Sequence, residues 1–273
     1  MNTWQPINFC PIDRLIICRK QLHQAVQLPS AFARNILPKD PSDASASLSW
    51  SPKIGGLKSN STKDGNIGVA LVVADFELII LQGDRRLAAL NLHNRSVHEG
   101  LQWLKSEVSS LGLPGENINL ELPYEIEVYD YTMRLSKDEG ALKTLASMFS
   151  DADQLFKEIE QREKHAEQVR CWPHHFDLAT LLPQKFDAAG ELLQSVGVGM
   201  SPGDDATPEP YIYVNIWPNV DYDQLANHAL EQGYWNESDW SGAVLKYSDF
   251  VDGNQQEVIE RFLTSTIGFL KKQ

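Results

Sequence analysis

Three segments in the second half of the chain alternate between apolar and polar positions: Cys171–Leu181, Leu193–Ser201 and Tyr211–Trp217. A period of two is typical of β-strands, whose successive side chains point to opposite faces of a sheet. The even-numbered positions are apolar, with His174 as the exception, so this face is predicted to pack on a core. Its members are Trp172, Phe176, Leu178, Val196, Val198, Met200, Ile212, Val214 and Ile216.

The odd-numbered positions of the same segments are small, polar or aromatic. They are Cys171, His175, Asp177, Ser195, Gly197, Gly199, Ser201, Tyr211, Tyr213, Asn215 and Trp217. Glycine inside a strand marks a bulge or the close approach of another group. Tyr and Trp combine apolar surface with a polar group, which suits a pocket or an interface. This face is predicted to be covered by a helix or by the N-terminal half, to line a small-molecule site, or to form a homo-oligomer interface.

The first half contains a second meander. The apolar runs Ile67–Val73, Phe76–Leu81 and Leu87–Leu92 are separated by turn residues and predict antiparallel strands. Further strands are predicted around Leu48–Trp50 and Ile118–Leu122. A last strand is predicted over Gly242–Tyr247.

Capping residues mark the helices between the strands. Ser96 with Glu99, and Ser136 with Glu139, have the spacing of capping boxes and precede helical apolar stripes. The second of these helices is long, and its charged tail extends toward Gln168. Other helices are predicted over Ile12–Val26, which Pro29 limits, over Tyr222–Gln232 between an Asp221 cap and Gly233, and from Asn254 onward.

These elements predict an α+β fold with two similar halves, each an antiparallel meander with helices, joined by a long helix. The N-terminal half spans residues 1–130, the linking helix residues 131–170 and the C-terminal half residues 171–273. The halves are expected to pack as one compact unit.

Charge and composition narrow the function classes. The net charge of −13 disfavours nucleic acid and anionic membrane surfaces as partners, since both require clustered Lys and Arg. No run of 18 apolar residues and no basic-then-apolar leader is present, so neither a membrane span nor secretion is expected. Cys10, Cys18 and Cys171 have spacings that suit free, mostly buried thiols in a reducing compartment. A soluble, cytoplasmic protein is predicted.

The segment Cys171–Asp177 is the densest group of possible metal ligands. Cys171, His175 and Asp177 share one face of the predicted strand, and a further ligand has to come from elsewhere. Asp204, Asp205 or Glu209 could supply it. A metal-assisted hydrolase using His175 and Asp177 is therefore one alternative. The favoured interpretation of this segment is structural: one histidine lies at the edge of the core, and the carboxylate is hydrogen-bonded to the backbone. No metal is therefore assigned.

Ser201 lies in a Gly-x-Ser-x-Gly pattern but is not predicted to be a nucleophile. The next residue is Pro202, which has no N–H to stabilise an oxyanion. The nucleophile elbow also has to open a helix, and the Pro-rich segment 203–210 cannot form one. Asp204 and Asp205 equally disfavour a phosphate-binding turn at these glycines.

The chain resembles a bacterial family of uncharacterised proteins, a domain of unknown function. The likeness is strongest in short motifs: Phe176–Ala179, Ser195–Gly197 with Pro202 and Gly203, Pro208–Tyr213, and Phe262 with Leu263. The resemblance implies a shared site at Asp177, Gly203, Glu209 and Tyr213. Family members do not usually carry histidine at positions 174 and 175, which weakens the metal alternative. The family has no assigned reaction, cofactor or partner.

The leading hypothesis is a protein that binds a small molecule on the odd-numbered face. The candidate ligand-binding residues are Asp177, His175, Ser201, Glu209, Tyr211, Tyr213, Asn215 and Trp217. The alternatives are the hydrolase and a structural or assembly protein that buries this face in a homo-oligomer. Catalytic residues and cofactor are not identified by the sequence.

Overall fold

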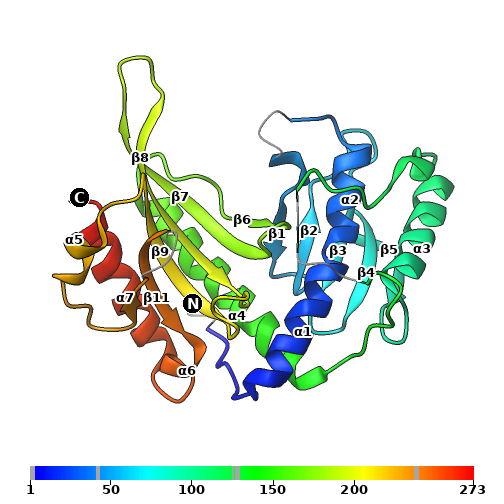
Figure 1. The fold of residues 1–273 in the computed structure, drawn as a ribbon. Helices are drawn as coiled ribbons and strands as arrows, with labels where there is room; N and C mark the ends of the chain where they lie inside the picture. Colours follow the sequence, from blue (N-terminus) through cyan, green and yellow to red (C-terminus); the bar gives the residue numbers. More distant parts are fainter. Residues whose placement is uncertain (1–3, 41–43, 125, 127–129, 237–239) are drawn as a thin grey trace. The chain divides into compact units, whose positions relative to one another are not determined.

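The structure, a computed structural model, describes residues 4–40, 44–124, 126, 130–236 and 240–273. It contains helices and antiparallel strands, which confirms the α+β class (Figure 1). The chain forms two compact units. Unit 1 comprises Met1–Ile12, Ser147–Val169 and Asp177–Gln273, and unit 2 comprises Asp13–Ala146 and Arg170–Phe176. These bounds differ from those expected, because the first residues of the chain and most of the long helix belong with the C-terminal strands.

Unit 2 is an antiparallel sheet with helices. The strand order is β6-β1-β2-β3-β4-β5. The strands are β1 (Leu48–Ser51), β2 (Gly56–Ser59), β3 (Ile67–Val72), β4 (Glu77–Gln82), β5 (Arg85–Asn91) and β6 (Arg170–Trp172). The helices are α1 (Ile12–Ala25), α2 (Gln27–Ile36) and α3 (Val97–Ser110), with short 3-10 turns at Ala44–Ala46 and Gly115–Asn117. Helix α2 packs on β2, β3 and α3. The predicted meander and the helix after Ser96 are confirmed.

Two predictions for unit 2 are wrong. Residues 118–122 form no strand, because the chain leaves the 3-10 turn at Gly115–Asn117 in an irregular path. The helix predicted over Ile12–Val26 is confirmed as α1 (Ile12–Ala25), but Pro29 does not end it, because a second helix starts at Gln27 and holds Pro29 in its first turn. Proline is tolerated there because the first N–H groups of a helix have no partner within the helix.

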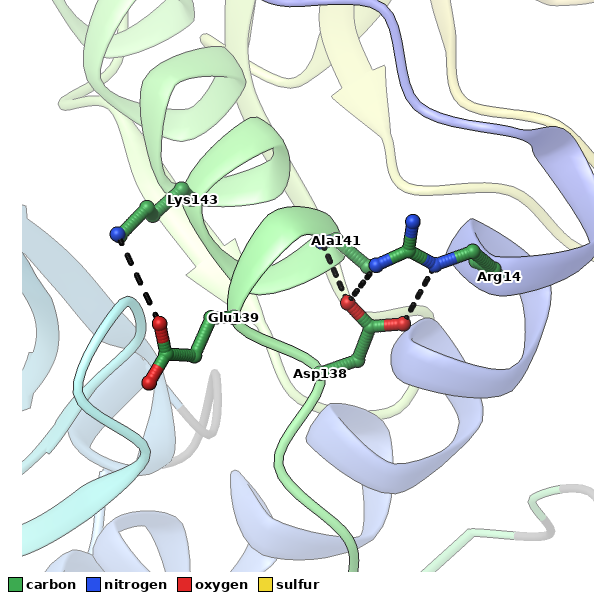
Figure 2. Close-up of polar contacts among 5 residues, drawn as sticks. All are labelled: Arg14, Asp138, Glu139, Ala141 and Lys143. Atoms are coloured by element: carbon green, nitrogen blue, oxygen red, sulfur yellow. Dashed lines mark hydrogen bonds and ion pairs between the residues drawn. The ribbon is translucent and has the colours of Figure 1, made fainter.

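Helix α4 (Glu139–Arg162) begins differently from the prediction. The predicted capping box of Ser136 and Glu139 is absent, and Asp138 caps the helix by accepting a 3.1 Å hydrogen bond from the Ala141 N–H (Figure 2). The same carboxylate binds Arg14 of α1 through Nε at 2.7 Å and Nη2 at 2.5 Å. Arg14 also lowers the pKa of Asp138. A residue distant in sequence therefore selects which side chain caps α4.

Unit 1 contains antiparallel strands in the order β7-β8-β9-β11-β10. Its strands are β7 (Asp177–Phe186), β8 (Leu192–Ser201), β9 (Tyr211–Trp217), β10 (Tyr234–Trp235) and β11 (Ser241–Lys246). Its helices are α5 (Tyr222–Ala226), α6 (Tyr247–Phe250), α7 (Gln255–Leu270) and the part of α4 that starts at Ser147. Figure 1 shows the β7–β8 hairpin extending beyond the other strands of this sheet as a long arm.

The even-numbered face of this sheet is the core of unit 1, as predicted. Val196, Val198, Met200 and Val214 are fully buried there. Helix α7 packs on β8, β9 and β11. The odd-numbered residues consequently lie on the opposite face of β7, β8 and β9.

The predicted strand Cys171–Leu181 is interrupted, and one predicted helix is too long. Residues 173–176 form a turn between β6 and β7, closed by a 2.7 Å hydrogen bond from the Phe176 N–H to the Trp172 carbonyl. Phe176 has a φ of 55°, outside the strand region. The helix after Asp221 ends at Ala226, because the chain soon turns into β10.

Two further features of the described residues complete the fold. Cys10, Cys18 and Cys171 are free and buried, as expected. In the part of the chain that the structure describes, no helix has both the length and the apolar composition needed to cross a bilayer.

The two helix starts give a direct test of capping. Ser96→Ala removes the hydroxyl that accepts from the Glu99 N–H at 3.1 Å and is expected to cost about 1 kcal/mol. Asp138→Ala is expected to cost at least about 1 kcal/mol, because it removes both the cap and the partner of Arg14. Ser136→Ala, which removes no helix cap, is expected to cost less than about 0.5 kcal/mol. Urea unfolding followed by circular dichroism measures all three, and equal costs for Ser136 and Asp138 would contradict this assignment of the cap.

Candidate functional site

A tyrosine of β9 lies flat across the middle strand of the unit 1 sheet. Tyr213 pairs with Gly199 of β8, which in turn pairs with Ala179 of β7. A Cβ atom on Gly199 would lie 2.2 Å from the Tyr213 Cζ, so the ring occupies the space that a side chain would fill. The Tyr213 hydroxyl donates a 2.5 Å hydrogen bond to Asp177 Oδ2 on β7. Asp177 and Tyr213 therefore share one face, as the alternating pattern predicts.

The same arrangement recurs at two other glycines. The side chain of Asn215 lies over Gly197, with Oδ1 2.1 Å from the position of an added Cβ. The ring of Trp240 lies over Gly242 of β11, with Cζ3 at 2.6 Å. The Trp240 and Tyr213 rings lie 6.0 Å apart. The close approach predicted at the strand glycines is thus made, at these positions, by flat side chains of the chain itself.

A second tyrosine–aspartate pair lies beside the first. The Tyr211 hydroxyl donates a 2.5 Å hydrogen bond to Asp204 Oδ2, and the Tyr211 and Tyr213 rings lie 6.1 Å apart. Asp204 is held in its loop by a 2.6 Å bond from the Thr207 N–H. Ser201, at the end of β8, accepts a 3.1 Å hydrogen bond from the Gly203 N–H. The loop after β8 therefore extends the face with a second carboxylate.

Both phenols are hydrogen-bond donors. Burial, followed by the hydrogen bond to Asp204, raises the pKa of Tyr211. Burial, followed by the charge of Asp177, raises the pKa of Tyr213 well above its usual range. Protonated phenols and two carboxylates make this face rich in acceptors. Lys246, which pairs with Tyr211 across β9 and β11, has its Nζ 5.0 Å above the ring of Tyr234.

Asn215 and Trp217, at the far end of the face, have groups that a ligand could contact. Asn215 is half-buried, and its Oδ1 is a buried atom without a hydrogen-bond partner among the described residues. Trp217 pairs with Ser195 and is 53% exposed. We name the surface formed by Asp177, Ser201, Asp204, Tyr211, Tyr213, Asn215, Trp217 and Trp240 the polar-aromatic face.

His175 does not belong to this face by strand phase. It is exposed in the turn of residues 173–176, where its ring lies 4.1 Å from that of His174. The turn places it in unit 2, whereas Asp177 begins β7 of unit 1. The predicted alternation of His175 with Asp177 along one continuous strand is wrong for this reason. Among the described residues, no three His, Cys, Asp or Glu side chains are grouped closely enough to hold a metal ion.

Glu209 has a local structural contact. Its Oε2 accepts a 2.8 Å hydrogen bond from the Ser248 N–H in α6. A carboxylate near the start of a short helix satisfies a free backbone donor. This contact ties the loop before β9 to α6, and the other candidates, from Asp177 to Trp217, form the face without Glu209.

Two members of the face were missed as site residues in the sequence. The sequence presents Asp204 only as a possible metal ligand or as a carboxylate of a surface loop. Its contact with Tyr211 depends on the path of that loop and has no sequence signal. Trp240 lies outside the predicted strands. The sequence feature that could have indicated Trp240 is Gly242, two residues later. Gly242 is a strand glycine like Gly197 and Gly199, and such glycines mark the close approach of another group.

Comparison of the chain with protein families, with curated proteins and with solved structures found no match. The resemblance to an uncharacterised bacterial family therefore stays a prediction from short motifs. The geometry of unit 1 therefore provides the observations that bear on function.

The flat position of Tyr213 can be tested by adding one methyl group. Gly199→Ala places a Cβ inside the Tyr213 ring, so we expect the ring to move, the bond to Asp177 to break and stability to fall by about 2 kcal/mol. Gly268→Ala is the matched control, because no atom lies within 4 Å of its added Cβ. Alanine favours a helix over glycine by up to about 1 kcal/mol, so this control should stabilise the protein. Urea unfolding measures both, and a neutral Gly199→Ala would show that the ring is not held against β8.

Proposed function

We propose that this chain binds a small organic ligand on the polar-aromatic face. The observation that supports this most is the acceptor atom Oδ1 of Asn215, which is buried without a donor among the described residues and lies beside half-buried and exposed aromatic rings. Buried polar atoms are normally hydrogen-bonded, and an exception calls for an explanation such as a missing partner. Because Oδ1 lies against Gly197, a ligand N–H or O–H satisfies this atom once the Asn215 amide turns away from β8.

The chemistry of the face favours a ligand that donates hydrogen bonds and has a flat apolar part. Asp177, Asp204 and Asn215 supply acceptor oxygens, and Tyr213 and Trp217 supply aromatic surface. Amines and amides meet both requirements, and a cationic amine also gains from the faces of the rings. Carboxylates and phosphates are disfavoured by the two aspartates. The proposal is limited to binding, because the described groups do not define a reaction.

A thermal-shift screen tests the proposal. Flat amines and amides are expected to raise the unfolding temperature, while matched carboxylates do not. A ligand at 100 times its Kd stabilises the folded state by about 2.7 kcal/mol. Trp217→Ala is expected to weaken binding about tenfold, the loss of about one stacking contact.

Tyr222→Ala is the matched control for Trp217→Ala. Tyr222 is an exposed aromatic residue of the same unit, located in α5. Its replacement should leave ligand affinity unchanged. The proposal fails if no library member stabilises the protein, or if both replacements weaken binding equally.

A second candidate function, self-assembly, is favoured by exposed apolar side chains on the arm. Phe186 is 49% exposed, Leu193 51% and Trp217 53%, and all three lie on or beside the β7–β8 hairpin. Clustered exposed apolar residues are typical of interaction surfaces. A second copy of the chain burying this arm accounts for them.

Sedimentation velocity separates the two functions. Assembly through the arm predicts a concentration-dependent oligomer that Leu193→Glu converts to a monomer. Met133→Glu is the control, because Met133 is 62% exposed and belongs to unit 2. A wild-type protein that is monomeric across the micromolar range rules out this candidate and leaves ligand binding.

A further inference from the structure

Side chains of α4, α6 and α7 hold the segment Trp4–Pro11 against the rest of unit 1. The segment has no regular secondary structure. Gln255 of α7 binds both backbone groups of Ile7, accepting from its N–H at 2.8 Å and donating to its carbonyl at 2.7 Å. The Tyr247 hydroxyl accepts from the Cys10 N–H at 2.8 Å. We call this segment the N-terminal strap, and its release breaks no strand or helix.

A buried carboxyl group forms the third anchor of the strap. Asp151 of α4 is 2% exposed, and its Oδ1 accepts a 3.0 Å hydrogen bond from the Gln5 N–H. Its Oδ2 is buried without a partner among the described residues. An ionised carboxylate can accept about four hydrogen bonds, and here one is supplied. The neutral form of the acid fits this environment better.

The cavity beside Asp151 is otherwise lined by apolar residues. It lines a cavity of about 10 Å³ with residues of α4, β9, α6 and α7, including Met148, Ile212, Phe250 and Ile259. Trp4 and Ile7 of the strap close this cavity. Among the described residues that line it, Asp151 is the sole titratable or charged side chain. Burial raises the pKa of Asp151 to about 7, against the smaller opposite effect of the Gln5 N–H.

We propose that the N-terminal strap is a pH-dependent closure of this apolar cavity. The strap is seated while Asp151 carries a proton. When Asp151 ionises, the strap lifts, water reaches the carboxylate, and Ile212, Phe250 and Ile259 lose their cover.

The direction of the pH effect follows from proton linkage. The pKa of Asp151 is about 7 with the strap seated and close to 3.8 in water, so the seated state binds more protons between these values. Asp151 contributes its full stabilisation of the seated strap below about pH 4. This contribution is lost as the pH rises to about 7. The opening constant therefore rises about tenfold per pH unit in this window and is constant above it.

Residue-resolved hydrogen exchange of the full chain tests the closure. The amides of Gln5, Ile7 and Cys10 are followed between pH 5 and pH 8, and each rate is corrected for the pH dependence of chemical exchange. Their protection factors are expected to fall about tenfold per unit up to pH 7 and then to level off. The amide of Val214 in β9 should keep its protection, which separates lifting of the strap from unfolding of the unit.

Two asparagine variants of α4 provide the controls. Asp151→Asn keeps an oxygen for the Gln5 N–H but cannot ionise, so it should give strap protection that does not change with pH. Asp153→Asn alters another buried aspartate of α4, which instead binds Lys157, and should retain the wild-type profile. The proposal is overturned if wild-type strap protection is independent of pH, if Asp151→Asn keeps the dependence, or if Val214 loses protection together with the strap.

Discussion

The hydrogen bond between Tyr213 and Asp177 is the interaction on which the polar-aromatic face depends, and it requires glycine where the Tyr213 ring crosses the middle strand. Strands lie about 4.8 Å apart, so a side chain of β9 reaches β7 only by crossing β8 flat. Gly199 permits this crossing, and Gly197 permits the parallel position of Asn215. The face is therefore a layer of side chains lying along the sheet, in which Asp177, Ser201 and Tyr211 are buried and Trp217 is exposed.

The sequence predicted the strands of this face well where the residue types on both faces of a strand follow a clear pattern. β8 and β9 agree with the predicted segments almost to the residue, because one side is buried in the core and the other carries glycine and aromatic residues. The prediction failed at residues 173–176. Phenylalanine at a positive φ is rare and leaves no sequence signal, so the break at Phe176 that removes His175 from the strand phase was invisible.

Other differences arose where a distant residue decides a local structure. Ser96 and Ser136 have equivalent local spacing, yet only Ser96 caps its helix, since Arg14 fixes Asp138 at the start of α4. Periodicity cannot reveal a contact between residues more than a hundred positions apart. In the same way, strand glycines indicated a close approach, but the identity of the approaching groups, Tyr213 and Trp240, depends on register and loop path.

The strap joins the beginning of the chain to its last helix, and this has a consequence for folding during synthesis. Unit 2 ends at Phe176, so all its residues have left the ribosome while most of unit 1 is still untranslated. The backbone of Ile7 can form its hydrogen bonds to Gln255 only after that residue, 248 positions later, has been synthesised. Because domains generally fold as units during translation, unit 2 can mature first, and unit 1 reaches its final form only after Gln255 of α7 has been synthesised.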